Sequence, residues 1–410
     1  MSFTTLGLGP RLLNGVSSMG YTDPTPIQME AIPHILEGTD VVGVAQTGTG
    51  KTAAFVLPLL QRTPTRQGVR ALIVTPTREL ALQIYEVVRE VSRHTGHRAA
   101  VVYGGVGIQP QVDKVRRGVD VVIACPGRLL DLHSRRALDL SKVETLVLDE
   151  ADRMLDMGFW PDVRRILNLL PEERQNLLFS ATMSPDVLKI VQSTLHDPVR
   201  VEVSPPSTPI ERIEQTLYPV CRTQKTDLLV KLLERNEHTR TLVSTRTKHR
   251  ADRLNKQLER KGVGSAAIHG GRTQGQRQRA LEAFRSGRSP VLVATDVVAR
   301  GIDVDDVSHV VNYDMPNTPE DYVHRIGRTA RAGASGSAIS FLSSEEFAGL
   351  TEIEKVLGST IACEDLDGFH YAPREIPAAD RSVKKAHVPG SKARTRTGRR
   401  GGSGRAGRRN

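Results

Sequence analysis

The chain has 410 residues, of which 38% are hydrophobic and 25% charged, a balance typical of a globular protein with buried cores. At about 100–200 residues per domain, this length predicts two or three domains. No apolar run approaches the ~18 residues of a membrane helix, and the N-terminus lacks the pattern of a secretory signal. The three cysteines, Cys125, Cys221 and Cys363, show no metal-ligand spacing and form no disulfide framework. We therefore expect a cytoplasmic location, in a reducing compartment.

The basic charge is concentrated at the C-terminal end. The sequence holds 57 Lys or Arg and 46 Asp or Glu, for a net charge of +11. Residues 381–410 hold eleven of the basic residues and none of the acidic ones, which leaves 46 of each in residues 1–380. The high isoelectric point is therefore no evidence that the folded part binds nucleic acid.

Short apolar runs, each followed by a stretch long enough for a helix, predict an α/β fold. In the first half these runs lie at 41–44, 71–74, 100–103, 121–123, 145–148 and 177–179. They are apolar throughout rather than alternating, which is typical of strands buried on both faces of a parallel sheet. The segments 53–60 and 79–94 are predicted to be helices.

A proline-rich segment divides the chain into two halves. Three prolines in 204–209 can continue neither a helix nor a central strand, so this segment is predicted to be a linker. The apolar runs resume at 241–243, 266–268, 291–293, 310–312 and 338–341. We therefore predict domains at 1–203 and 213–370, a linker at 204–212 and a disordered basic tail at 371–410.

A glycine-rich loop follows the first predicted strand and precedes a helix. It consists of Ala45, Gln46, Thr47, Gly48, Thr49, Gly50, Lys51 and Thr52. Glycines let backbone N–H groups surround phosphates, the Lys51 ammonium can reach the terminal phosphates, and the Thr52 hydroxyl can bind Mg²⁺. The loop begins with Ala45 where the strict pattern has Gly. The alternative is a glycine-rich turn without a ligand.

A second predicted strand, at 145–148, ends on carboxylates. Asp149 is placed to hold Mg²⁺, and Glu150 to orient or deprotonate a water molecule that attacks a phosphate. An acidic strand end alone is more often a solvated turn. The phosphate loop upstream favours the catalytic interpretation.

The sequence resembles the DEAD-box ATP-dependent RNA helicases of superfamily 2. That family is named for four residues that occur here as Asp149, Glu150, Ala151 and Asp152. The resemblance covers about residues 3–345, and the segment 245–249 with the short basic tail looks closest to the bacterial RhlE-type branch. It implies two tandem RecA-like domains, an RNA-dependent ATPase and helicase activity, and ATP and Mg²⁺ as cofactors.

The resemblance also implies roles for single residues. Gln28 and Tyr21 would bind adenine, since a Gln amide can pair with adenine N6 and N7. In the second half Arg328 and Arg331 would stabilise the γ-phosphate in the transition state, and Asp303 would meet the ribose or the domain interface. At a spacing of three, Arg325, Arg328 and Arg331 would share one helix face. Ser180 and Thr182 would couple hydrolysis to strand separation.

Several loop segments match RNA contacts of that family. The residues are Thr77, Arg78, Gly105, Arg128, Arg277 and Thr295. Their Arg, Thr and backbone donors suit phosphate and sugar oxygens, and aromatic residues make up only 4%, so we expect sequence-independent backbone binding. The tail from Arg381 is expected to add salt-dependent RNA affinity, and its alternative is a solubilising or partner-docking role.

Three positions depart from the family pattern. Cys125 stands where Thr is usual, which removes a hydroxyl contact to RNA. Ala330 stands where Gly is usual, which we interpret as a mild helix-favouring change. Ser244 stands where a supporting Phe is usual, which predicts poorer alignment of the arginines.

The favoured function is local unwinding of short RNA duplexes or remodelling of ribonucleoproteins, with ATP shared between two domains. The chain is expected to act as a monomer without membrane contact, with ribosome-assembly or RNA-degradation proteins as partners. The alternatives are an ATP-gated RNA clamp with little unwinding, and a DNA translocase.

Overall fold

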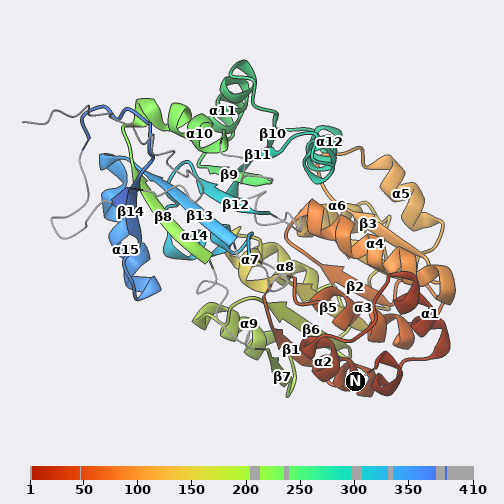
Figure 1. The fold of residues 1–410 in the computed structure, drawn as a ribbon. Coiled ribbons are helices and arrows are strands. Elements are labelled where there is room, and N and C mark those ends of the chain that lie inside the picture. The colour runs from red at the N-terminus through yellow and green to blue at the C-terminus, as the bar shows by residue number, and fades with distance from the viewer. Residues whose placement is uncertain are drawn as a thin grey trace, which may run out of the picture.

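The computed structural model describes residues 2–46, 48–203, 213–234, 240–296, 307–330 and 336–374, together with the short strand 384–385. The predicted linker at 204–212 and nearly all of the basic tail lie outside this part of the chain. Two sheets flanked by helices form the described structure (Figure 1). None of the described helices is long and apolar enough to cross a membrane.

The first half, up to residue 203, is built on seven strands. The helices are η1 (Phe3–Leu6), α1 (Pro10–Ser18), α2 (Pro26–Glu37), α3 (Lys51–Arg62), α4 (Arg78–Thr95), α5 (Gln109–Arg116), α6 (Pro126–Ser134), α7 (Ala151–Asp156), α8 (Trp160–Leu167) and α9 (Pro185–Thr194). The strands are β1 (Val41–Val44), β2 (Ala71–Val74), β3 (Ala99–Val102), β4 (Val121–Ala124), β5 (Thr145–Asp149), β6 (Gln175–Ser180) and β7 (Val199–Glu202). They lie in the order β3-β4-β2-β5-β6-β1-β7, and every pair is parallel.

The second half has the same kind of architecture. The helices are η3 (Arg222–Gln224), α10 (Lys225–Leu233), α11 (Lys248–Arg260), α12 (Gln274–Arg285), α14 (Pro319–Ile326), η5 (Ser344–Glu346) and α15 (Phe347–Leu357). The strands are β8 (Ile213–Pro219), β9 (Thr241–Thr245), β10 (Ser265–Ile268), β11 (Val291–Thr295), β12 (His309–Asn312), β13 (Gly336–Leu342), β14 (Ala362–Asp365) and β15 (Lys384–Lys385). Their order is β10-β11-β9-β12-β13-β8-β14-β15, again all parallel.

The prediction of an α/β fold with two parallel sheets is therefore confirmed. Each predicted strand lies within or beside an observed one, and the predicted helices at 53–60 and 79–94 are α3 and α4. The sequence analysis missed β7, β8, β14 and β15, all of which lie toward one edge of their sheets. Strand β15 lies within the segment 371–410 that was expected to be disordered. The precise domain bounds at 203 and 213 remain a prediction.

The first core depends on close packing between β1, β6 and α3. Strands β1, β2, β4, β5 and β6 are buried along their whole length. Gly43 in β1 lies under the ring of Phe179, and a Cβ at this position would lie 2.4 Å from that ring. The Phe179 ring in turn packs on Phe55 of α3, with 5.2 Å between ring centroids. Packing of this kind holds β1 and α3 in place, and with them the loop that joins the two.

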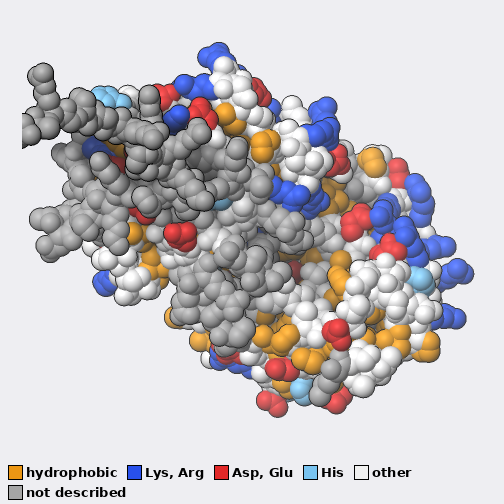
Figure 2. All heavy atoms as spheres, in the orientation of Figure 1, with side chains coloured by type: hydrophobic (Ala, Val, Ile, Leu, Met, Phe, Trp, Pro, Cys, Tyr) orange, Lys and Arg blue, Asp and Glu red, His pale blue; other side chains and the backbone are white. Residues whose placement is uncertain are grey.

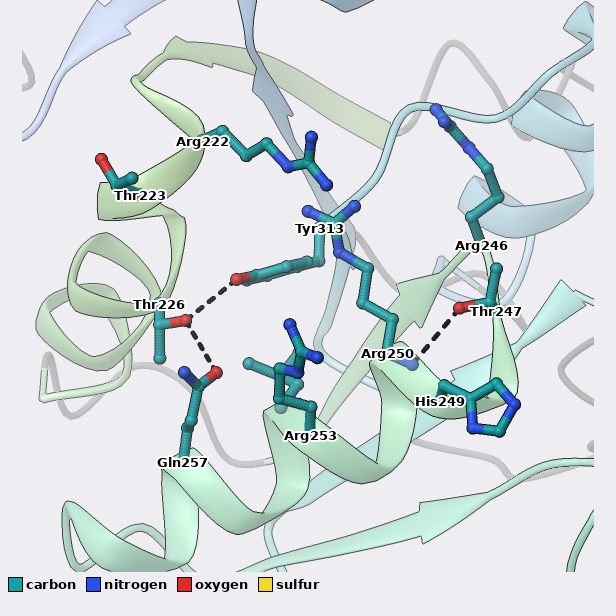
Figure 3. A pocket seen from close by; sticks show the side chains of 11 residues that line it. Arg222, Thr223, Thr226, Arg246, Thr247, His249, Arg250, Arg253, Gln257 and Tyr313 are labelled. Carbon is teal, nitrogen blue, oxygen red and sulfur yellow. Dashed lines mark hydrogen bonds between the residues drawn. The ribbon is translucent and has the colours of Figure 1, made fainter.

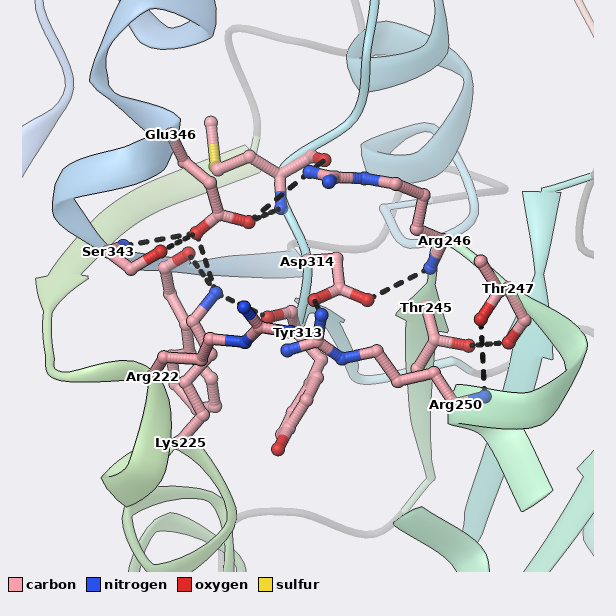
Figure 4. Close-up of polar contacts among 12 residues, drawn as sticks. Arg222, Lys225, Thr245, Arg246, Thr247, Arg250, Tyr313, Asp314, Ser343 and Glu346 are labelled. Carbon is pink, nitrogen blue, oxygen red and sulfur yellow. Dashed lines mark hydrogen bonds and ion pairs between the residues drawn. The ribbon is translucent and has the colours of Figure 1, made fainter. Parts of the chain in front are cut away.

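The second half contains a buried ion-pair network around Glu346 (Figure 4). Its carboxylate accepts from the ammonium of Lys225 at 2.6 Å, and Lys225 is only 1% exposed. The same carboxylate accepts from Ser343 and from the backbone N–H of Met315, and lies 3.5 Å from Arg246. Burial alone would raise the pKa of Glu346, but the Lys225 ammonium and these hydrogen bonds hold it below its usual value. One carboxylate thus joins α10, the segments that follow β9 and β12, and the residue that precedes η5.

Candidate nucleotide and RNA site

The glycine-rich loop joins the end of β1 to the start of α3, as predicted. Gly48 and Gly50 both have positive φ, at 88° and 91°, in the region that favours glycine. A Cβ on Gly50 would lie 2.5 Å from the amide nitrogen of Gln28. Lys51 is 7% exposed and donates from Nζ to the carbonyl of Ala45 at 2.5 Å, so its ammonium lies folded over the loop. Thr47 lies outside the described residues.

Gln28 connects this loop to the start of α2. Its Oε1 accepts from the N–H of Thr25 at 2.9 Å, and its Nε2 donates to the carbonyl of Gly50 at 3.0 Å. Both ends of the amide are therefore bonded within the chain, and adenine would have to share or replace these bonds. Tyr21, the second predicted adenine contact, is 40% exposed beside this segment.

The carboxylates at the end of β5 lie beside the phosphate loop. Asp149 is 3% exposed, and burial raises its pKa to about 7 against the opposing effect of the Lys51 ammonium. Glu150 has φ 55°, a strained left-handed conformation, and its Oε2 accepts from Nη1 of Arg153 at 2.8 Å. Arg153 is 5% exposed and was missed by the sequence analysis, although its spacing of three from Glu150 on a predicted helix was a usable signal.

Of the two predicted coupling residues, Thr182 contacts the acidic segment directly. Thr182 donates from both its backbone N–H and its hydroxyl to Oδ2 of Asp152, each at 3.0 Å. A cavity of about 230 Å³ opens beside this contact, and α14 of the second half forms its far wall through Glu320, Val323 and His324. Asp152 and Thr182 therefore line a cavity to which both halves of the chain contribute. Ser180 is fully buried at the end of β6.

The prediction that three arginines share one helix face is wrong. Helix α14 ends at Ile326, so Arg328 lies in the turn beyond it, and Arg331 lies outside the described residues. Arg325, the one arginine of the three on the helix, is 3% exposed and binds Asp296 with Nε at 2.5 Å and Nη2 at 2.9 Å. Arg325 is therefore a buried structural residue. Arg328 is 7% exposed, and its Nε donates to the carbonyl of His324 at 3.2 Å.

The conformation of Ala330 corrects a second expectation, namely that this residue favours a helix. Its φ is 55°, so the alanine stands in a left-handed turn and favours no helix there. A non-glycine residue in this region costs about 1–2 kcal/mol. The glycine that the family usually has would relieve this strain.

We expect Ala330→Gly to stabilise the C-terminal half by about 1 kcal/mol, because glycine adopts this φ without strain. Denaturant unfolding followed by circular dichroism would measure the change. The matched control is Ala348→Gly in α15, an exposed helical position where the same change should destabilise by about 1 kcal/mol. Equal losses at both positions would contradict the strain at Ala330.

The predicted RNA contacts come together from both halves. Thr77 caps α4, and the guanidinium of Arg78 lies so close to Gly105 that a Cβ there would meet it at 2.1 Å. Arg277 of α12 pairs with Glu79 of α4, with 2.6 Å between Nη2 and Oε2, and both side chains are about 95% buried. Burial lowers the pKa of Arg277, while Glu79 opposes the shift. The role of Glu79 was not anticipated, because its partner is nearly two hundred residues away in the sequence.

Two further predicted RNA contacts are Arg128 and Thr295. Arg128 donates from Nη2 to the carbonyl of Val106 at 3.0 Å, next to Gly105. Thr295 ends β11 and is 9% exposed. Asp303 lies outside the described residues. Basic side chains also gather over α4 and α5 on the face shown in Figure 2.

The departures at 125 and 244 are both visible in the structure. Cys125 is the N-cap of α6, where it makes no side-chain capping bond, and burial raises the pKa of its thiol to about 12. Ser244 is fully buried in β9, and its hydroxyl has no hydrogen-bond partner among the described residues. The effect of the missing Phe on the arginines remains a prediction.

We expect Cys125→Thr to stabilise the N-terminal half by about 1 kcal/mol, because a Thr hydroxyl at an N-cap accepts from the first helical N–H groups. The free energy of unfolding in denaturant measures this. The control is Cys125→Val, which has the shape of Thr without the hydroxyl. A gain with Val as large as with Thr would mean that packing, not capping, was responsible.

The comparisons with known proteins agree with these features. A sequence model described as DEAD/DEAH box helicase matches residues 25–190, and one described as helicase conserved C-terminal domain matches residues 224–333. The narrower RhlE-type assignment remains a prediction.

Two relatives and one solved structure show the extent of the similarity. The chain is 44% identical to the DEAD-box ATP-dependent RNA helicase CshA of Bacillus cereus over 355 residues, which are 86% of this chain and 68% of the relative. It is 41% identical to the DEAD-box ATP-dependent RNA helicase RhpA of Helicobacter pylori, over 88% of this chain and 73% of the relative. The structure of S. cerevisiae Dbp5 bound to RNA and ADP BeF3 matches with a TM-score of 0.78 and 34% identity, over 88% of this chain and 95% of that chain. The chain belongs to the DEAD-box family of ATP-dependent RNA helicases.

Proposed function

We propose that one ATP is bound by the loop 45–52 of the first half and is hydrolysed only when Arg328 of the second half, with Arg331, closes over it on RNA. The observation that carries this proposal is the buried ion pair between Glu79 and Arg277, which joins the two halves among the predicted RNA contacts. Closure would then assemble the site, so that RNA binding gates hydrolysis.

Within this site each residue has a proposed part. Lys51 would move from the Ala45 carbonyl to the phosphates, which is a short change of partner for an ammonium. Glu150, held by Arg153, would orient the attacking water and accept its proton. Arg328 would stabilise the charge that develops on the phosphate oxygens, and Asp303 would meet the ribose or the domain interface.

The residues present fit a magnesium ion. The Thr52 hydroxyl and the buried Asp149 carboxylate supply the oxygen atoms that Mg²⁺ prefers, beside the loop for the phosphates. When bound, the ion would neutralise charge on the phosphates. Lys51 and the backbone N–H groups of the loop bind the same phosphates from the protein side.

The RNA would be bound through its backbone by Thr77, Arg78, Gly105, Arg128, Arg277 and Thr295, independently of sequence. Dbp5 has been solved with RNA bound, and the similarity in fold supports the same use of this surface here. We favour local unwinding of RNA as the activity. The alternative, an ATP-gated RNA clamp, would use all of the same residues. The cytoplasmic location and the monomeric state remain predictions.

The test is the rate of ATP hydrolysis by the full chain with RNA, with DNA and with no nucleic acid. We expect at least a ten-fold higher rate with RNA than in the other two reactions. Equal rates in all three would contradict gated closure, and stimulation by DNA as strong as by RNA would favour a DNA translocase. Displacement of a strand from a short RNA duplex would separate unwinding from clamping.

A further inference from the structure

A second cavity lies in the C-terminal half, and none of the proposed nucleotide or RNA contacts lines it. Its volume is about 530 Å³, and it lies between η3, the first turns of α11 and the end of β12 (Figure 3). One wall is the segment 246–250, which overlaps the stretch 245–249 that resembles the RhlE-type branch. The proposed function assigns no role to this cavity.

Four arginines reach this cavity from three elements. Arg222 comes from η3, Arg246 directly follows β9, and Arg250 and Arg253 come from one face of α11. The cavity also lies at the N-terminus of α11, a helix of 13 residues whose N-cap is Thr247. The helix dipole therefore adds partial positive charge to that of the guanidinium groups.

The carboxylates nearby offset the charges of Arg246 and Arg250 and leave those of Arg222 and Arg253 largely uncompensated. Asp314 is fully buried and holds Arg250, with 3.0 Å between Oδ1 and Nη1. Arg246 lies 3.5 Å from the largely buried Glu346 and so belongs to the network around that carboxylate (Figure 4). The contact of Arg222 with Glu345 is long, at 3.6 Å, and an exposed pair of this kind contributes little.

The side chain of Arg253 has neither an ion pair nor a hydrogen bond with any residue that the structure describes, and it is exposed. Arg222 is exposed as well, with 63% of its side chain accessible. Both guanidiniums are therefore available to a ligand without breaking a buried contact.

The neutral groups of the cavity are hydrogen-bonding groups as well. Thr223, Thr247 and Gln257 line it beside the arginines. The ring of Tyr313 forms the floor, is 5% exposed, and is fixed by a 2.9 Å hydrogen bond between its hydroxyl and Thr226. A ring buried in this way cannot stack on a base.

We propose that this cavity binds a compact anion that carries at least two phosphate groups. Guanidinium forks match phosphate oxygens two at a time, and the volume lies within the range of about 300–1,000 Å³ usual for small-ligand sites. A single RNA strand is a poorer fit, because such sites combine a groove along the backbone with exposed aromatic platforms. Here the arginines converge on one hollow instead.

The test is calorimetric titration of the full chain with tripolyphosphate, with ADP and Mg²⁺ saturating so that the phosphate loop is occupied. The double variant Arg222→Gln with Arg253→Gln should bind tripolyphosphate at least ten-fold more weakly, because two charge-assisted contacts are lost. The matched control is Lys256→Gln with Arg260→Gln, which removes the same charge from exposed positions of α11 outside the cavity. The control should stay within two-fold of the unaltered chain.

Three results would overturn the proposal. One is equal affinity for tripolyphosphate in the double variant and the unaltered chain, and another is an equal loss in the control, which would indicate unspecific charge attraction. The third is a loss of single-stranded RNA binding in the double variant with tripolyphosphate binding intact, since this would assign the cavity to RNA. Thermal melting of each variant checks that the fold is kept.

Discussion

Replacement of Glu150 by Gln should lower the RNA-stimulated rate of ATP hydrolysis by about 10²–10⁴-fold, the range that a general base contributes. The amide keeps the size of the side chain and can still contact Arg153, but it cannot accept a proton from water. Because the phosphate loop is untouched, ATP affinity should change little. The measurement is steady-state ATPase activity at saturating RNA, together with nucleotide binding.

The control for this prediction is Glu173→Gln, the same change at an exposed position. It should leave the rate unchanged. A melting curve for Glu150→Gln is needed as well, because the substitution weakens a buried contact with Arg153. A variant that folds, binds ATP and still turns over at the normal rate would remove Glu150 from the proposed mechanism.

Replacement of Arg277 by Ala should lower the RNA-stimulated rate by about 100-fold at saturating RNA. The substitution leaves the buried carboxylate of Glu79 without its partner in the closed arrangement, and losing one partner of a buried pair costs about 3–5 kcal/mol. At 1.36 kcal/mol for each factor of ten, the lower figure corresponds to about two decades in rate.

Arg279→Ala is the matched control, since it removes an exposed arginine from the same helix. The double variant Glu79→Ala with Arg277→Ala supplies a sharper test, because it removes both charges. If the ion pair acts as proposed, the double variant should be no slower than Arg277→Ala alone. Losses that simply add would mean that the two residues act separately.

The sequence predicted most of the fold because buried parallel strands leave a strong apolar signal. The runs at 71–74 and 121–123 became strands of the expected kind, while β7 and β14 escaped because strands nearer a sheet edge are mixed in polarity. Local spacing also predicted the phosphate loop and its position between β1 and α3.

The errors arose where tertiary contacts override local pattern. The spacing of three among the arginines suggested one helix face, but α14 ends at Ile326 and Arg325 turns inward to Asp296. Composition could not show that Ala330 has positive φ. Nor could any local pattern connect Glu79 with Arg277, because only the packing of the two halves brings them together.

The network around Glu346 has a consequence for protein engineering. Because Lys225, Arg246 and Ser343 all depend on one carboxylate, none of these four residues is an independent choice. A chimera that takes α10 from one homologue and η5 from another would separate the Lys225 ammonium from the carboxylate that pairs with it. Segments exchanged between members of the family therefore need to be transplanted with their whole complement of charges.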